Sequence, residues 1–91
     1  MTRIEMVNVG ARNYVMASRV VSVLSSATAP IRRVIREGKD CGLLMDVSQH
    51  REVRTLIVLD DGHMVATFLS PEQVMRRFID PSDTLDEQDD E

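Results

Sequence analysis

The residues best suited to chemistry lie in one polar stretch, residues 48–54, which separates two runs that favour β-strands. The stretch contains no glycine or proline, and its far end carries Arg51, Glu52 and Arg54. A turn that only reverses the chain more often uses Asn-Gly or Asp-Gly, whereas loops held on a rigid sheet often carry binding residues. Guanidinium groups bind phosphates and guanine edges through several donors at once. We therefore predict that this loop, which also holds His50, binds a partner.

The sequence carries none of the common patterns of catalysis or metal binding. It has no GxGxxG, no P-loop, no CxxC and no HExxH. Its two histidines, His50 and His63, belong to different turns. The single cysteine, Cys41, falls at the C-terminal end of a predicted helix, a position that does not activate a thiol. We expect a protein that is not an enzyme, with no metal, no cofactor and no small-molecule substrate.

The length and composition favour one small domain in a reducing compartment. The 91 residues suit a single domain, which we place at residues 1–79, and 43% of them are hydrophobic. One cysteine allows no internal disulfide. No apolar run approaches the ~20 residues of a membrane helix, and the first ten residues lack the apolar core of a signal peptide. We expect a cytoplasmic protein with no membrane partner.

The net charge of −4 is unevenly distributed along the chain. Residues 80–91, the acidic tail, hold seven acidic residues and no basic one, and we expect them to be disordered. Residues 1–79 hold 11 basic and 8 acidic residues, a balance of +3, and ten of the basic residues are arginine. Such arginine enrichment indicates either a nucleic-acid partner or a GC-rich genome, and composition does not separate the two.

Six stretches predict the strands of a small, mostly antiparallel sheet: residues 3–8, 14–16, 19–24, 43–47, 55–59 and 64–69. A tight hairpin is predicted at Gly62, between the last two. The strand at 55–59 is apolar at four successive positions, which predicts cover on both faces of the sheet. The chain's helices supply one cover, and a neighbouring subunit is a candidate for the other. Arg19 is the first residue of its predicted strand, at the rim of the sheet. It is either a binding residue or a solvated charge that prevents pairing with another strand edge.

The first predicted helix begins at Thr28 or Ala29 and ends near Cys41, where Gly42 supplies a left-handed stop. Apolar and basic side chains repeat along it as two neighbouring stripes: Ile31, Val34 and Ile35, then Arg32, Arg36 and Lys39. A basic stripe of this kind is most often only a solvated face. It becomes functionally interesting if it lies beside the loop at 48–54.

The second predicted helix begins after Ser70, with Pro71 in its first position and Gln73 completing a capping box. Its end is predicted at Asp80, because the residue before a proline avoids the helical conformation. The predicted buried face is apolar, with two arginines outside it: Val74, Met75, Phe78 and Ile79 within, Arg76 and Arg77 in solvent. The expected fold is therefore α+β, a small sheet with two helices.

Over most of residues 5–78, the order of these features resembles the RemA-like family, the extracellular matrix regulatory protein A homologues of bacteria. The resemblance rests on short motifs in a fixed order: Asn8-Val9-Gly10, Ser18-Arg19, Ala29-Pro30-Ile31 with the basic pair after it, Gly42 with Asp46, and Pro71-Glu72. It implies a small transcription regulator that assembles into a homo-oligomeric ring. Outward-facing basic residues of the ring would bind double-stranded DNA.

The family carries an arginine-rich run after the position of Asp46, typically two arginines, one other residue and a third arginine. Here Arg51 matches the first arginine and Arg54 the last, and Arg19 matches the arginine ahead of the third strand. The resemblance implies that these three residues contact the DNA backbone or groove, and we expect them to converge on one surface. Further candidates for contacting DNA or modulating its binding are Arg12, Arg32, Arg33, His50 and Glu52.

The chain departs from the family pattern at Glu52, which stands where the second arginine would be, and in its acidic tail. The remaining arginines can suffice for DNA binding, or Glu52 can accept a hydrogen bond from a cytosine amino group. The tail can also screen the DNA face until DNA displaces it. The alternative function is an oligomeric assembly or protein-interaction module that has lost DNA binding. Single-stranded RNA is a poorer fit, because only three aromatic residues are available for base stacking.

Overall fold

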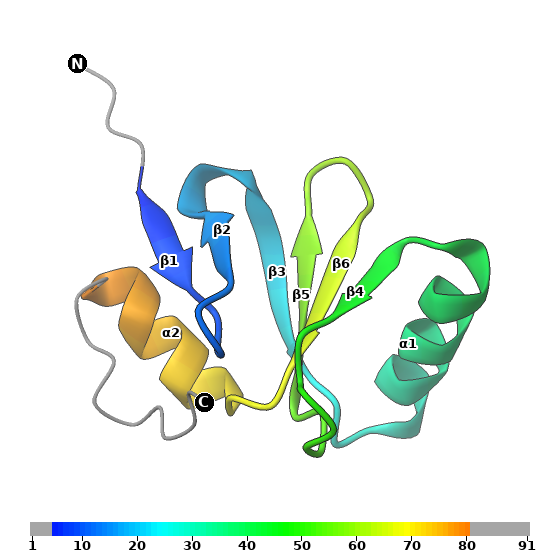
Figure 1. Cartoon of the computed structure of the whole chain (residues 1–91). Helices are drawn as coiled ribbons and strands as arrows, with labels where there is room; N and C mark the ends of the chain where they lie inside the picture. The colour runs from blue at the N-terminus through cyan, green and yellow to red at the C-terminus, as the bar shows by residue number, and fades with distance from the viewer. Residues whose placement is uncertain (1–4, 81–91) are drawn as a thin grey trace.

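The computed structural model describes residues 5–80, which form two helices and six strands (Figure 1). In chain order the elements are β1 (Met6–Asn8), β2 (Tyr14–Met16), a 3₁₀ turn (Ala17–Arg19), β3 (Val20–Ser25), α1 (Ala29–Cys41), β4 (Leu44–Asp46), β5 (Thr55–Leu59), β6 (Met64–Thr67) and α2 (Pro71–Ile79). Neither helix in this range is long and apolar enough to cross a membrane. The start of the first predicted strand and residues 81–91 of the acidic tail lie outside the described residues.

The larger sheet has four strands in the order β3-β5-β6-β4, and β1 pairs with β2 in a separate two-stranded sheet. β5 is antiparallel to both of its neighbours, whereas β4 runs parallel to β6. The α+β class and the two helices are confirmed, and the sheet is mixed, with antiparallel pairs in the majority. The segment at 47–54 therefore joins no neighbouring strands: it carries the chain from β4 past β6 to β5.

The chain covers both faces of the larger sheet at its centre. Leu56 and Ile57 point to opposite faces of β5, and neither has exposed surface. On the Ile57 face, β1, β2 and α2 complete a core through Val7, Val15 and Val74. The predicted burial of β5 on two sides is thus confirmed for these two residues.

Helix α1 supplies the cover on the Leu56 face, for which a neighbouring subunit was a candidate. Gly38 is the buried residue of α1, and a Cβ placed on it would lie 2.5 Å from the Met64 side chain. Met64 pairs with Val58, two positions from Leu56 and therefore on the same face. A glycine at 38 lets the helix approach the sheet closely.

Both helices begin and end at the predicted residues. Thr28 is the N-cap of α1, without a side-chain capping bond, and Gly42 ends the helix with φ 78°. At α2, the Ser70 hydroxyl accepts from the Gln73 amide at 3.1 Å, and the Ser70 amide donates to the Gln73 side chain at 2.8 Å. This capping box fixes the start of α2 at the end of the sheet where the loop at 47–54 also lies.

The predicted buried face of α2 is partly wrong. Arg77 is 2% exposed and its Nη1 donates to the Asn8 carbonyl at 3.2 Å, whereas Met75 and Ile79 are 45% and 81% exposed. The buried stripe is Val74, Arg77 and Phe78, a helical spacing that faces β1 and β3. A backbone carbonyl of β1 on this face accepts a donor, which an apolar side chain at 77 would not supply.

Gly10→Ala is expected to destabilise the fold more than Gly62→Ala. Both glycines have positive φ (118° and 92°), but a Cβ on Gly10 would lie 3.0 Å from the Thr67 Oγ1 and 3.2 Å from the Phe68 ring, whereas a Cβ on Gly62 meets nothing within 4 Å. We expect Gly10→Ala to lower the free energy of unfolding by about 1–3 kcal/mol. Urea denaturation measures both variants, and equal losses would rule out the contact with Thr67 as the cause.

Candidate functional site

The C-terminal end of β6 holds two surface segments together. Thr67 is fully buried, and its hydroxyl donates to the Val9 carbonyl and accepts from the Leu69 amide. The Thr67 carbonyl accepts from the Arg54 amide at 2.9 Å. These bonds bring the turn at 9–13 and the loop at 47–54 to the same end of the sheet, although about 40 residues separate them in the sequence.

Both segments contain a tight turn in a strained conformation. Ala11 and Arg12 have φ of 53° and 65°, and Gln49 and His50 have φ of 56° and 68°. Positive φ at two central residues is the pattern of a type I′ turn, which normally uses asparagine or glycine. Each such residue costs roughly 1 kcal/mol or more, and strain of this kind is often kept at functional sites. A turn opened by Gly10 and a loop at 48–54 were both expected from the sequence. The left-handed conformations were not, because neither pair of residues includes a glycine or asparagine.

The second turn positions Arg51 over an aromatic ring. The Arg51 amide donates to the Ser48 carbonyl at 3.0 Å, and its guanidinium carbon lies 4.0 Å from the centre of the Phe68 ring. A cation stacked on an aromatic face is held in one direction without losing its charge. Arg51 is exposed, so its guanidinium is oriented and still accessible to an anion.

Asp46 anchors the start of the loop. Its Oδ1 accepts from the Ser48 hydroxyl at 2.6 Å and from the Ser48 amide at 2.9 Å. Partial burial acts to raise the pKa of Asp46, but these hydrogen bonds, with the charges of Lys39 and His50, outweigh it and hold the pKa below its ordinary value of 3.8. Asp46 is therefore ionised at neutral pH and fixes the loop in place.

A basic groove of about 760 Å³ opens beside the loop. Its walls are α1, the linker at 25–27, the loop end at 52–54 and the start of α2 at 70–72. Four cations line it: Arg32, Arg36, Lys39 and Arg54. Glu52 and Glu72 also line it, so the cations exceed the carboxylates.

The basic stripe of α1 thus lies beside the loop, and hydrogen bonds hold it there. Ser26 donates through its hydroxyl to the Val53 carbonyl at 2.7 Å and through its amide to the Arg54 carbonyl at 3.1 Å. Arg32 Nη1 donates to the Ser26 and Ala27 carbonyls at 3.1 and 3.0 Å. Arg33 is exposed on the same helix but does not line the groove.

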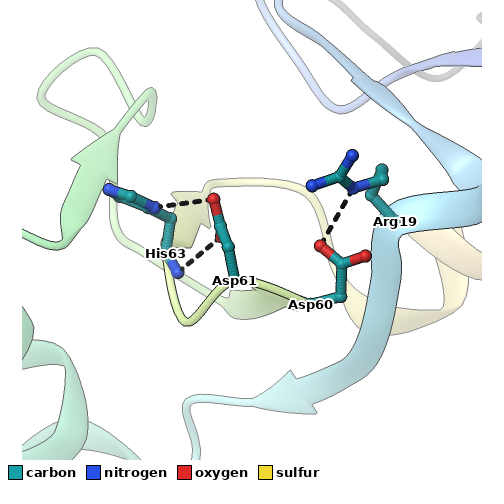
Figure 2. Close-up of polar contacts among 4 residues, drawn as sticks. All are labelled: Arg19, Asp60, Asp61 and His63. Carbon is teal, nitrogen blue, oxygen red and sulfur yellow. Dashed lines mark hydrogen bonds and ion pairs between the residues drawn. The ribbon is translucent and has the colours of Figure 1, made fainter.

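Arg19 lies just before β3, at the end of the sheet opposite to Arg54, so it does not join Arg51 and Arg54. The two ends can be followed along β3 and β5 in Figure 1. Arg19 Nε donates to Asp60 Oδ1 at 2.9 Å, beside the β5–β6 hairpin (Figure 2). The length of β5 separates Arg19 from Arg54 by roughly 20 Å along the strand. The prediction that the three arginines converge is wrong within this chain, because β3 and β5 are antiparallel and their residues 19 and 54 occupy opposite ends.

The hairpin end has a second polar contact. His63 Nδ1 lies 3.0 Å from Asp61 Oδ2, and the His63 amide donates to Asp61 Oδ1 at 3.0 Å (Figure 2). This bond lowers the pKa of Asp61 below its ordinary value. His50 lies in the loop at the opposite end, and residues 5–80 contain no group of three metal-ligating side chains.

Asp46→Asn is expected to remove an acid-dependent transition of the loop. Because folding lowers the Asp46 pKa, its stabilising effect is present above pH 3.8 and is lost as the pH falls through the lowered value. In an NMR titration towards acid pH, the Ser48 and Arg51 amide signals should move in the unsubstituted protein and stay still in Asp46→Asn. Asp61→Asn is the matched control and should keep the transition. A transition that survives in Asp46→Asn would contradict the assignment.

Comparison with known proteins finds one family and several relatives. The family model for RemA-like proteins, described as extracellular matrix regulatory protein A-like, matches residues 6–78. Three relatives carry the name "Putative regulatory protein". The one from Acaryochloris marina is 41% identical over 83 residues, which cover 91% of this chain and 94% of the relative. The one from Oleidesulfovibrio alaskensis is 40% identical over 79 residues, 87% and 94% of the two chains.

The third relative, from Clostridium beijerinckii, is 36% identical over 88 residues, 97% of this chain and 98% of its own. All three matches span nearly the full length of both proteins, so they include both helices, the larger sheet and the loop at 47–54. The shared name indicates a regulatory protein rather than an enzyme. On the strength of the family match and these relatives, the chain belongs to the RemA-like family.

Proposed function

We propose that this protein is a cytoplasmic transcription regulator that binds double-stranded DNA as a homo-oligomeric ring. One observation carries the proposal: six cationic side chains line the groove or belong to the two turns at the loop end of the sheet, namely Arg12, Arg32, Arg36, Lys39, Arg51 and Arg54. Four of them line the groove, Arg12 lies in the first strained turn and Arg51 closes the second. Phosphate groups along a duplex are the ligand that such a surface attracts.

We expect Arg19 to contact the DNA at a point separate from Arg51 and Arg54. Its distance from Arg54, roughly 20 Å along β5, is shorter than one turn of duplex, about 34 Å. A single duplex that lies along the subunit can therefore meet both ends of the sheet. Asp60 neutralises Arg19 in part, so we expect Arg19 to contribute less than Arg51.

Two apolar patches at opposite edges of the sheet favour the ring. Beside β3, Val21 is 64% exposed and lines one hollow with Met75 of α2, which is 45% exposed. Beside β4, Met45 is 52% exposed, and Leu43, two positions before it in the chain, is 38% exposed. Two different patches that meet between successive subunits form a head-to-tail interface, and such an interface closes into a ring when the rotation between subunits allows it.

Glu52 is the observation that favours the alternative, an assembly or protein-interaction module without DNA. Its carboxylate lines the basic groove beside Arg54, so it weakens the positive potential at that point. The groove still holds more cations than carboxylates, and for this reason we place DNA binding first.

Arg51→Ala and Arg54→Ala should each weaken binding to duplex DNA by about tenfold or more, because each removes a cation that pairs with a phosphate in every subunit of the ring. The slope of log affinity against log salt should also become shallower, by roughly 0.9 for each phosphate that is no longer neutralised. Arg33→Ala, which removes the same charge outside both the loop and the groove, is the matched control. Fluorescence anisotropy over a salt series measures all three, and equal behaviour of Arg51→Ala and Arg33→Ala would refute the loop assignment.

Glu52→Gln, measured in the same assay, removes a negative charge from the groove and tests the role of Glu52. If Glu52 only opposes the phosphates, the substitution should tighten binding to duplexes of every sequence. If it reads a cytosine amino group, the substitution should instead reduce the preference between sequences. Weaker binding to all sequences would contradict both roles.

Val21→Glu and Met45→Glu should each produce a monomer, because a buried charge disrupts one edge of the head-to-tail contact. In a mixture of the two variants, the unsubstituted β4 edge of Val21→Glu can still bind the unsubstituted β3 edge of Met45→Glu. The mixture should therefore form a dimer and nothing larger. Light scattering after size exclusion measures the mass in each case. A mixture that remains monomeric would contradict a head-to-tail interface between these edges.

A further inference from the structure

We propose that the acidic tail docks in the basic groove of its own chain and covers Arg54. The inference deepens the proposed function, because Arg54 is also a proposed contact for DNA, and it names how that contact is regulated. The occupant is a segment of this chain, residues 80–91, whose seven acidic residues and absence of basic ones oppose the charge of the groove.

The groove has the chemistry that such a segment requires. Arg32, Arg36, Lys39 and Arg54 come from α1 and the loop and line one space, which Ile35 and Val53 also line. The tail carries the opposite charge and also has one apolar residue, Leu85, among its carboxylates. Charge complementarity and a small apolar contact together distinguish this groove from the hairpin end, where Arg19 and His63 already pair with Asp60 and Asp61.

The tail is long enough to reach the groove. Helix α2 is nine residues long, about 14 Å, and its first residues form one wall of the groove while Asp80 lies at its far end. The 11 residues after Asp80 span up to about 36–40 Å when extended. A return along α2 uses about four of them. Residues 85–91 then remain, and they hold five of the seven acids.

Covalent attachment makes a weak contact sufficient. A short tether holds the tail at an effective concentration near the millimolar range, so modest affinity keeps the groove occupied. Phosphates of a duplex compete for the same cations. The tail thus raises the DNA concentration at which the regulator binds.

Lys39 provides a direct test, because it is the only lysine in the sequence and it lines the groove. A carbodiimide activates carboxylates, and a lysine amine in contact displaces the activated group to form an amide. In the full chain without DNA, we expect a cross-link between Lys39 and a residue of 83–91, found by mass spectrometry within a single chain. A link found only between two chains, or no link to the tail, would overturn the proposal.

Two charge reversals on α1 provide the matched control. Arg36→Glu places a negative charge in the groove and should lower the yield of the cross-link by about threefold or more. Arg33→Glu makes the same change outside the groove and should leave the yield unchanged. Equal losses in both variants would show a nonspecific effect of net charge and would contradict docking in the groove.

A DNA measurement separates this inference from the proposed function. A chain that ends at Asp80 keeps residues 6–78, the full extent of the family match, and should bind duplex DNA about tenfold more tightly at low salt. Unchanged affinity in a protein that binds DNA would refute the regulatory role of the tail. A Lys39 cross-link in a protein that binds no DNA in either form would refute the proposed function and leave the docking intact.

Discussion

The hydrogen bonds of Thr67 are the interactions on which the site depends. Its hydroxyl joins β6 to the turn at 9–13, and its carbonyl joins β6 to Arg54 at the end of the loop. Phe68, the next residue, supplies the ring under Arg51. The Thr67 side chain is fully buried, so removal of a partner would leave a polar group unsatisfied in the core. Two segments distant in the sequence are thereby held as one surface, and the strain of their left-handed residues is offset by this network.

The two ends of the sheet differ in charge because they differ in how the chain connects its strands. At the hairpin end, a short connection between β5 and β6 places carboxylates next to the cations, as in the contact of Arg19 with Asp60. At the loop end, the parallel position of β4 requires a long connection, and the linker to α1 and the start of α2 converge there too. The topology thus brings the basic stripe of α1 and Arg54 of the loop to one groove. A groove of this kind suits an extended anion, whether a nucleic acid or an acidic segment of the protein.

Local patterns predicted the elements well, and tertiary packing decided the remainder. The bounds of β5, the capping box at Ser70 and the left-handed Gly42 follow from residue types within a few positions. The burial of Arg77 did not, because its partner is a carbonyl of Asn8, which is distant in sequence. The separation of Arg19 from the loop arginines depends on the pairing of β3 with β5, which no local signal encodes.

The left-handed conformations of Gln49 and His50 could not be predicted, because this turn lacks the usual glycine or asparagine. The likeness to the RemA-like family supplied the candidate site, and the structure supplied the groove beside it.

The central claim is that the loop end of this sheet binds duplex DNA as part of an oligomer. Light scattering on the full chain, alone and with a duplex over a rising salt series, tests it most directly. We predict an oligomer whose own mass does not change with salt, and which holds the duplex at low salt and releases it steeply as salt rises, through the return of counterions to the phosphates. An intact oligomer that holds no duplex at low salt, both with the acidic tail and after deletion of residues 81–91, would contradict it.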